Sequence, residues 1–135
     1  MSSIGLPPHY RFTVKNETGQ TIASSSITVT AKRAKFDSSG VLTYEGSEAT
    51  VFSYGSTLGN GGFASGSTQD NTTNKYLGGD FLFTVTAPTS SSGHVILYLE
   101  RSTDAGTTWD SNGDGEAVAS LYFTASGTKR ASFAI

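Results

Sequence analysis

Oxygen-bearing side chains alternate along the segment from Asp110 to Glu116, which reads Asp-Ser-Asn-Gly-Asp-Gly-Glu. A calcium loop of the EF-hand type begins with this spacing, because oxygen ligands at every second position can turn toward one ion. The twelfth position of such a loop carries a bidentate glutamate, whereas this chain has Leu121 there. Asp110, Asn112, Asp114 and Glu116 are therefore a weak calcium candidate, and a long acidic connection between strands is the default. No other metal or cofactor is expected.

Side chains for acid, base or nucleophilic catalysis are sparse. The two histidines, His9 and His94, stand far apart in the sequence and outside any nucleophile motif, and cysteine is absent. Carboxylates could pair for glycoside hydrolysis, but any β protein of this size offers such pairs and nothing marks one out. The candidates are Glu45, Glu48, Asp80, Glu100 and Asp104. The sequence therefore predicts a protein that is not an enzyme.

The segment 102–109, Ser-Thr-Asp-Ala-Gly-Thr-Thr-Trp, places turn-forming residues at fixed spacing. Asp104 can accept hydrogen bonds from backbone N–H groups, Gly106 permits a positive φ, and Trp109 can fold back over the hairpin. The segment resembles the Asp-box pattern at Ser102, Asp104, Gly106, Thr108 and Trp109. The resemblance implies a structural hairpin away from any catalytic centre. A sialidase propeller is excluded, since it needs several blades and this chain has room for about one or two.

Composition favours one small domain with a thin core. The chain has 135 residues, of which 36% are hydrophobic, with 16 Gly, 8 Phe and 6 Tyr. Charged residues make up 15% and the net charge is −2, so no nucleic acid or anionic membrane partner is expected. The opening segment lacks the basic and apolar regions of a signal peptide, and no apolar run has the length of a membrane helix. We expect a soluble protein that is made and folded in the cytoplasm.

The elements that would position these residues are strands, because apolar residues recur with period two and no segment keeps a helical period. The stretch 95–100 is nearly all apolar, which predicts a central strand buried on both faces. The stretch 55–74 is rich in Gly, Ser, Asn and Thr and predicts a long loop with at most one weak strand. The other expected strands lie at 10–15, 27–36, 41–45, 49–54, 81–86, 117–123 and 130–135.

These strands predict an all-β fold, namely an antiparallel β-sandwich of immunoglobulin-like or jelly-roll-like type, with a small barrel as the alternative. The sandwich would occupy residues 10–135. Residues 1–9 would form an extended arm stiffened by Pro7 and Pro8, or else a frayed terminus. Pro7, Pro8 and the apolar C-terminal side chains of Phe133 and Ile135 are candidate contacts to a neighbouring subunit.

Aromatic side chains offer a different use of the surface. A sugar-stacking platform could form from Tyr44, Tyr54, Tyr76, Tyr98, Trp109 and Tyr122. Tyr44 and Tyr98 stand on opposite parity to the expected core residues, so a carbohydrate-binding module is one alternative function. Cross-strand aromatic pairs that stabilise the sheet are the simpler interpretation of these residues.

Most of the chain is similar to small β-rich proteins encoded among the structural genes of tailed bacteriophages. The similar segments are 16–36, DSSGVLTYE at 37–45, YLG at 76–78, FTVTAP at 83–88 and LYLERSTD at 97–104. The resemblance implies a virion component, either a head decoration (cement) protein or a small tail protein. Such a protein would be assembled in the host cytoplasm as a homo-oligomer that binds other capsid or tail subunits. A carbohydrate-binding module is the competing class, and a small hydrolase is a minor third.

Overall fold

The computed structural model describes residues 5–110 and 115–135, and this part of the chain consists of ten strands joined by turns and loops, without a helix. No helix that could span a membrane is therefore found among these residues. The strands are β1 (His9–Glu17), β2 (Ile27–Phe36), β3 (Leu42–Tyr44), β4 (Ala49–Ser53), β5 (Phe63–Ser65), β6 (Gln69–Asp70), β7 (Gly78–Ala87), β8 (Gly93–Arg101), β9 (Glu116–Phe123) and β10 (Gly127–Ala134).

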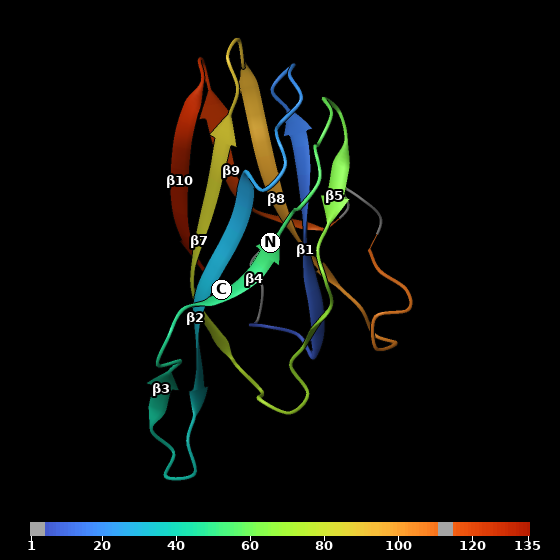
Figure 1. Cartoon of the computed structure of the whole chain (residues 1–135). Coiled ribbons are helices and arrows are strands. Elements are labelled where there is room, and N and C mark those ends of the chain that lie inside the picture. The colour runs from blue at the N-terminus through green and yellow to red at the C-terminus, as the bar shows by residue number, and fades with distance from the viewer. Residues whose placement is uncertain (1–4, 111–114) are drawn as a thin grey trace.

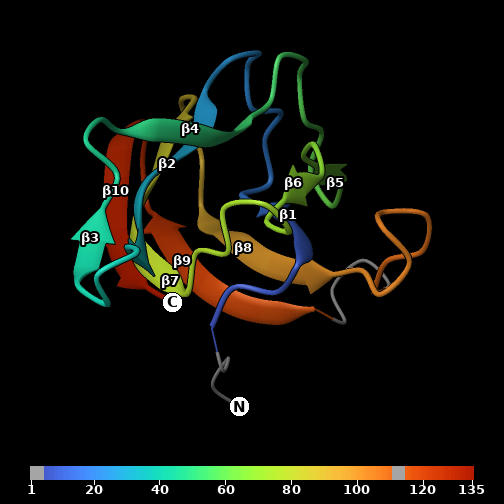
Figure 2. The ribbon, with the colours of Figure 1, turned by 90° about the horizontal axis from the view of Figure 1, so that it is seen from below.

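The strands form two antiparallel sheets that face each other (Figures 1 and 2). The β1 sheet has the order β5-β1-β8-β9, and β6 also pairs with β1. The β2 sheet has the order β10-β7-β2-β3, and β4 also pairs with β2. The predicted β-sandwich is thus confirmed, and the alternative of a small closed barrel is wrong.

The core lies between the sheets and follows the period-two pattern of the sequence. Tyr10, Phe12 and Val14 of β1 are buried on one side, and Phe81 and Phe83 of β7 are buried on the other. The ring of Phe12 meets that of Phe81 edge-on, with centroids 5.7 Å apart. Each fully buried side chain of this size stabilises the fold by about 1.5–3 kcal/mol, so these alternating residues hold the two sheets together.

Strand β8 is central, as predicted, because it pairs with β1 on one side and β9 on the other. Its outward side chains are buried to different degrees. Ile96 and Tyr98 are only half-buried, whereas Glu100 is completely buried. Among these three outward side chains, the expected full burial is therefore found at Glu100 alone. A buried carboxylate needs a cation or hydrogen-bond donors beside it.

The segment 55–74 is more ordered than predicted, since it contributes both β5 and β6 to the free side of β1. The N–H of Gly66, between these strands, donates to the Phe12 carbonyl at 2.8 Å. A Cβ at Gly66 would lie 2.6 Å from the Phe52 ring, so the backbone approaches the core where only glycine fits. Strands of two or three residues are too short to show an alternating pattern.

The expected N-terminal arm is shorter than predicted. Strand β1 begins at His9, and the side chain of Leu6 is already part of the core. The Leu6 N–H donates to the Leu77 carbonyl at 2.9 Å, and the Pro8 carbonyl accepts from the Asn71 N–H at 2.7 Å. Residues 5–9 are therefore bonded to the domain. The rest of the expected arm, residues 1–4, lies outside the described part.

Candidate functional site

The loop 102–109 is held by a compact set of hydrogen bonds. One oxygen of Asp104, Oδ1, accepts from the Thr108 N–H at 2.7 Å and from the Ser102 hydroxyl at 2.7 Å. Gly106 has φ +92°, and its carbonyl accepts from the Trp109 indole N–H at 3.0 Å. Hydrogen bonds from the Thr108 backbone, then from the Thr108 and Ser102 hydroxyls, lower the pKa of Asp104 to about 2. The bonds expected of Asp104 and the expected backbone of Gly106 are present.

Trp109 links this loop to a buried ion pair on the outer face of the β1 sheet. Its ring lies over the guanidinium of Arg11, whose Nε donates to Glu100 Oε1 at 2.7 Å. Thr13 donates its hydroxyl proton to the same oxygen at 2.6 Å. Glu100 Oε2 is buried and has no hydrogen-bond partner among the described residues. The loop thus covers Arg11, which is the one cation paired with the Glu100 carboxylate among residues 5–110 and 115–135.

The two histidines considered for catalysis are not brought together. His94 pairs across the ladder with Glu17 at one end of β1, while His9 stands at the other end. His9 Nε2 lies 3.7 Å from Asp70 Oδ1, and the His94 ring leans on Tyr122 with centroids 4.8 Å apart. Of the candidate carboxylates, Glu45 and Glu100 pair with arginines, and Asp104 is bound within its own loop. No base stands beside a nucleophile in this arrangement of histidines.

The calcium candidate lies partly outside the described residues, since Asn112 and Asp114 belong to 111–114. Asp110 Oδ2 accepts from the Arg101 N–H at 3.2 Å, and Glu116 Oε2 lies 3.3 Å from Arg101 Nη2. Both flanking carboxylates thus contact the same arginine. Across 5–110 and 115–135 no group of three or more His, Cys, Asp or Glu side chains is placed to hold a metal ion.

The candidate assembly contacts at the C-terminus turn toward the core. The Phe133 ring stacks on Phe81 with centroids 5.2 Å apart, and half-buried Ile135 also packs against the core cluster. The Ile135 carbonyl accepts from the Gly79 N–H at 3.0 Å. Phe133 and Ile135 are thus partly covered by the core, because β10 extends the inward alternation of β7, and their contact with a neighbour stays a prediction. Pro7 is half-buried and Pro8 is exposed.

The aromatic residues do not form one platform. Tyr44 belongs to the β2 sheet, whereas Tyr98 and Tyr122 lie on the β1 sheet. The ring of Tyr76 is covered by the Arg33 guanidinium at 4.6 Å, and Tyr54 packs against the core. A shared sugar-stacking surface made of all these residues is therefore wrong.

The segment 36–44, which we call the apolar hairpin, carries four of the six large apolar side chains that are exposed in the described part of the chain: Phe36, Val41, Leu42 and Tyr44. Phe36 pairs with Leu42 and Ala34 pairs with Tyr44, so the side chains within each pair share a face. The hairpin projects beyond the body of the sandwich (Figure 1). The sequence contains a signal for the exposure of Phe36, since Phe36 has the same parity along β2 as the outward-facing Lys32.

The base of the apolar hairpin is rigidly braced. Arg33 donates from Nε to Glu45 Oε1 at 2.7 Å and from Nη2 to Glu45 Oε2 at 3.1 Å. Its Nη1 also donates to the Tyr10 hydroxyl at 3.1 Å. Burial by itself raises the pKa of Glu45, but the hydrogen bonds and charge of Arg33 outweigh burial and hold that pKa below its usual value. The brace ties the hairpin to the first strand of the opposite sheet.

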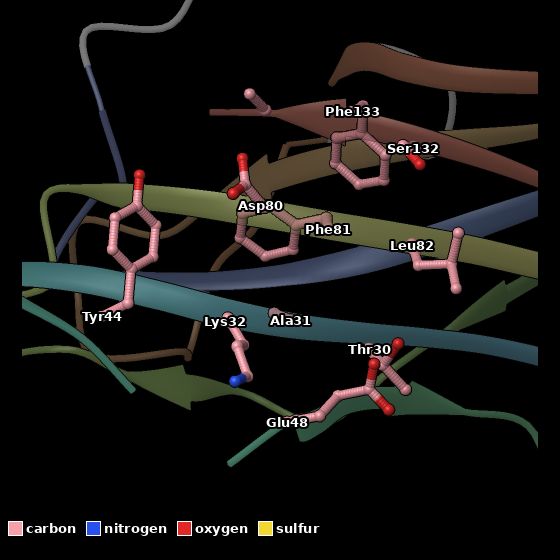
Figure 3. Close-up of a pocket in the computed structure, with 11 residues that line it drawn as sticks. Thr30, Ala31, Lys32, Tyr44, Glu48, Asp80, Phe81, Leu82, Ser132 and Phe133 are labelled. Carbon is pink, nitrogen blue, oxygen red and sulfur yellow. The ribbon is translucent and has the colours of Figure 1, made fainter. Parts of the chain in front are cut away.

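Beside the hairpin, the outer face of the β2 sheet is hollowed by an open depression of about 810 Å³ (Figure 3). Lys32 and Asp80 are directly opposite each other on β2 and β7, and Ala134 of β10 is opposite Asp80 on the other side. Tyr44 stands at one end of the depression. The lining residues are Thr30, Ala31, Lys32, Tyr44, Glu48, Asp80, Phe81, Leu82, Ser132, Phe133 and Ala134.

No family model, curated protein or solved structure matches this chain. Its surfaces are therefore the basis for a functional proposal.

Proposed function

We propose that this protein is a non-enzymatic structural component of a tailed-phage virion that binds neighbouring head or tail subunits through the apolar hairpin. The observation that carries the proposal is the exposure of Phe36 and Leu42 side by side on a projecting hairpin, where they are 59% and 48% exposed. A cluster of exposed apolar side chains on a soluble domain marks an interaction site.

The hairpin is suited to binding because its shape is fixed before a partner arrives. The bidentate Arg33–Glu45 pair holds its base, and Asp37 Oδ1 accepts from the N–H groups of Ser39 and Val41 at its tip, both at 2.9 Å. Little conformational freedom is then lost on binding. Burial of these half-exposed apolar side chains would supply part of the free energy that offsets the cost of association.

The virion assignment rests on the resemblance of segments such as 37–45 and 97–104 to structural proteins of tailed phages. No family model, curated protein or solved structure adds to that resemblance. The assignment is also supported by the low charge content, 15%, which leaves apolar contact and backbone pairing as the main means of association. Multiple copies, and contact between them, are part of the proposal.

The test is attachment to phage heads or tails that lack this protein, with sedimentation analysis of the purified full chain. We expect the wild type to form a defined oligomer or to attach to one of the two particles. Phe36→Ser and Leu42→Ser should each weaken attachment by about tenfold or more.

Tyr122→Ser is the matched control, because it removes a residue that is similarly exposed, at 50%, on the opposite sheet. Its attachment should equal that of the wild type. A monomer that ignores both heads and tails, or hairpin variants that attach normally, would overturn the proposal.

A further inference from the structure

We propose that the depression on the outer face of the β2 sheet is a binding site for a neutral saccharide, in addition to the assembly role of the apolar hairpin. The site would take a few sugar rings between Tyr44 at one end and Leu82 at the other (Figure 3). Its volume of about 810 Å³ lies within the range of small-molecule sites, about 300–1,000 Å³.

The first support is an unusual pair of carboxylates. Asp80 and Glu48 both line the depression, and neither takes part in an ion pair or a side-chain hydrogen bond with any described residue. The other carboxylates of 5–110 and 115–135 all have such a partner. The acceptors left over by the fold are therefore gathered in one place.

Donors and hydroxyls complete the polar set. Lys32 lies opposite Asp80, and its amine has one weak hydrogen bond, to the Gly46 carbonyl at 3.4 Å. Thr30 and Ser132 add hydroxyl groups that can both donate and accept. Because these side chains stand on paired strands, their backbone positions are fixed, and sugar hydroxyls could meet them without costly reordering.

The apolar side chains of the site match the apolar C–H face of a sugar ring. Tyr44 is 53% exposed, and its position is fixed by the pairing of β3 with β2. An aromatic ring can cover the C–H face of a sugar, while Leu82 and Ala134 add apolar side chains to the lining.

Other ligand classes fit this surface less well. A peptide strand laid along β7 would find no free backbone groups, because β7 is paired with β2 on one side and β10 on the other. A strongly anionic ligand would face Asp80 and Glu48 against Lys32 alone. The described residues also place no set of three metal ligands there. A neutral, hydroxyl-rich ligand is what remains compatible with the charges.

The experiment uses the ¹⁵N-labelled full chain titrated with cellohexaose, maltohexaose and chitohexaose, after a screen on a glycan array. At least one saccharide should bind saturably and shift the amide signals of residues 30–32 and 80–82. Tyr44→Ala and Asp80→Asn should each weaken binding by about tenfold. Both side chains are exposed, and melting curves will show whether the variants remain folded.

Tyr122→Ala is the matched control on the opposite sheet and should bind as the wild type does. Phe36→Ser should also retain saccharide binding, and Asp80→Asn should retain attachment to virion particles, so the two proposals fail separately. The saccharide site is overturned if no glycan binds, if binding survives both Tyr44→Ala and Asp80→Asn, or if the shifted amides lie on the β1 sheet.

Discussion

The guanidinium carbon of Arg11 lies 4.5 Å from the centroid of the Trp109 ring, and the same guanidinium neutralises the buried Glu100. Arg11 is thus held between a carboxylate below and an indole above. The loop that ends in Trp109 limits the access of water to the ion pair, which strengthens it.

Removal of one partner of the Arg11–Glu100 pair should strongly lower the free energy of unfolding. Arg11→Met leaves the carboxylate buried without a counter-charge, and we expect a loss of about 3–5 kcal/mol in the free energy of unfolding. The measurement is urea denaturation at neutral pH. The double variant Arg11→Met/Glu100→Met should recover most of the loss, whereas an equal loss in both would mean that Arg11 acts through packing alone.

Acid should weaken the fold through Asp104. Its folded pKa is about 2, below the ordinary value of 3.8, so its stabilising contribution is complete above 3.8 and disappears as the pH falls toward 2. The lowered pKa of Glu45 acts in the same direction. We expect the melting temperature to fall below about pH 4, and to fall less steeply in Asp104→Asn. Parallel melting profiles for the variant and the wild type would contradict this role of Asp104.

The N-terminal segment should contribute to stability. Leu6→Ala removes a buried side chain from the core, and we expect a loss of about 2 kcal/mol, at the low end for such a substitution because Leu6 lies at the margin of the core. Pro8→Ala, at an exposed position, is the control and should change the free energy of unfolding little. Denaturation curves that coincide for Leu6→Ala and the wild type would show that this segment is a loose end.

Two glycines with a positive φ should differ in their tolerance of alanine. Gly19 has φ +78° and open space around it, whereas a Cβ on Gly93, at φ +133°, would collide with the Glu17 carbonyl. Gly19→Ala should cost about 1 kcal/mol through backbone strain alone. Gly93→Ala should cost about 3 kcal/mol or more, since the β1–β8 ladder must also shift. Equal stability of the two variants by urea denaturation would contradict the collision.

The sandwich could be predicted because its long strands carry a regular pattern. In β7 the inward residues Phe81, Phe83 and Val85 are apolar, and most of the outward residues between them are not. This alternation predicts both the strand and its buried face. Strands β5 and β6 lack that signal, because they are short and join the sheet through backbone hydrogen bonds. Leu6 was missed because one apolar residue beside two prolines has no period.

The proposed binding surfaces depend on the tertiary arrangement of the strands, which local sequence patterns predict only in part. Parity places Phe36 on the outer face of β2, but the exposure of the hairpin also depends on where the neighbouring strand stops, since β7 pairs with β2 only as far as Ala34. The depression combines Thr30, Glu48, Asp80 and Ser132 from separate parts of the chain. Their proximity follows from strand order, which local patterns do not determine.

The features described above lie on two opposite faces of the sandwich. The apolar hairpin and the depression open on the outer side of the β2 sheet, while the loop 102–109 lies on the β1 sheet at the opposite face. A partner that bound at the hairpin, as proposed, would therefore leave the loop 102–109 uncovered.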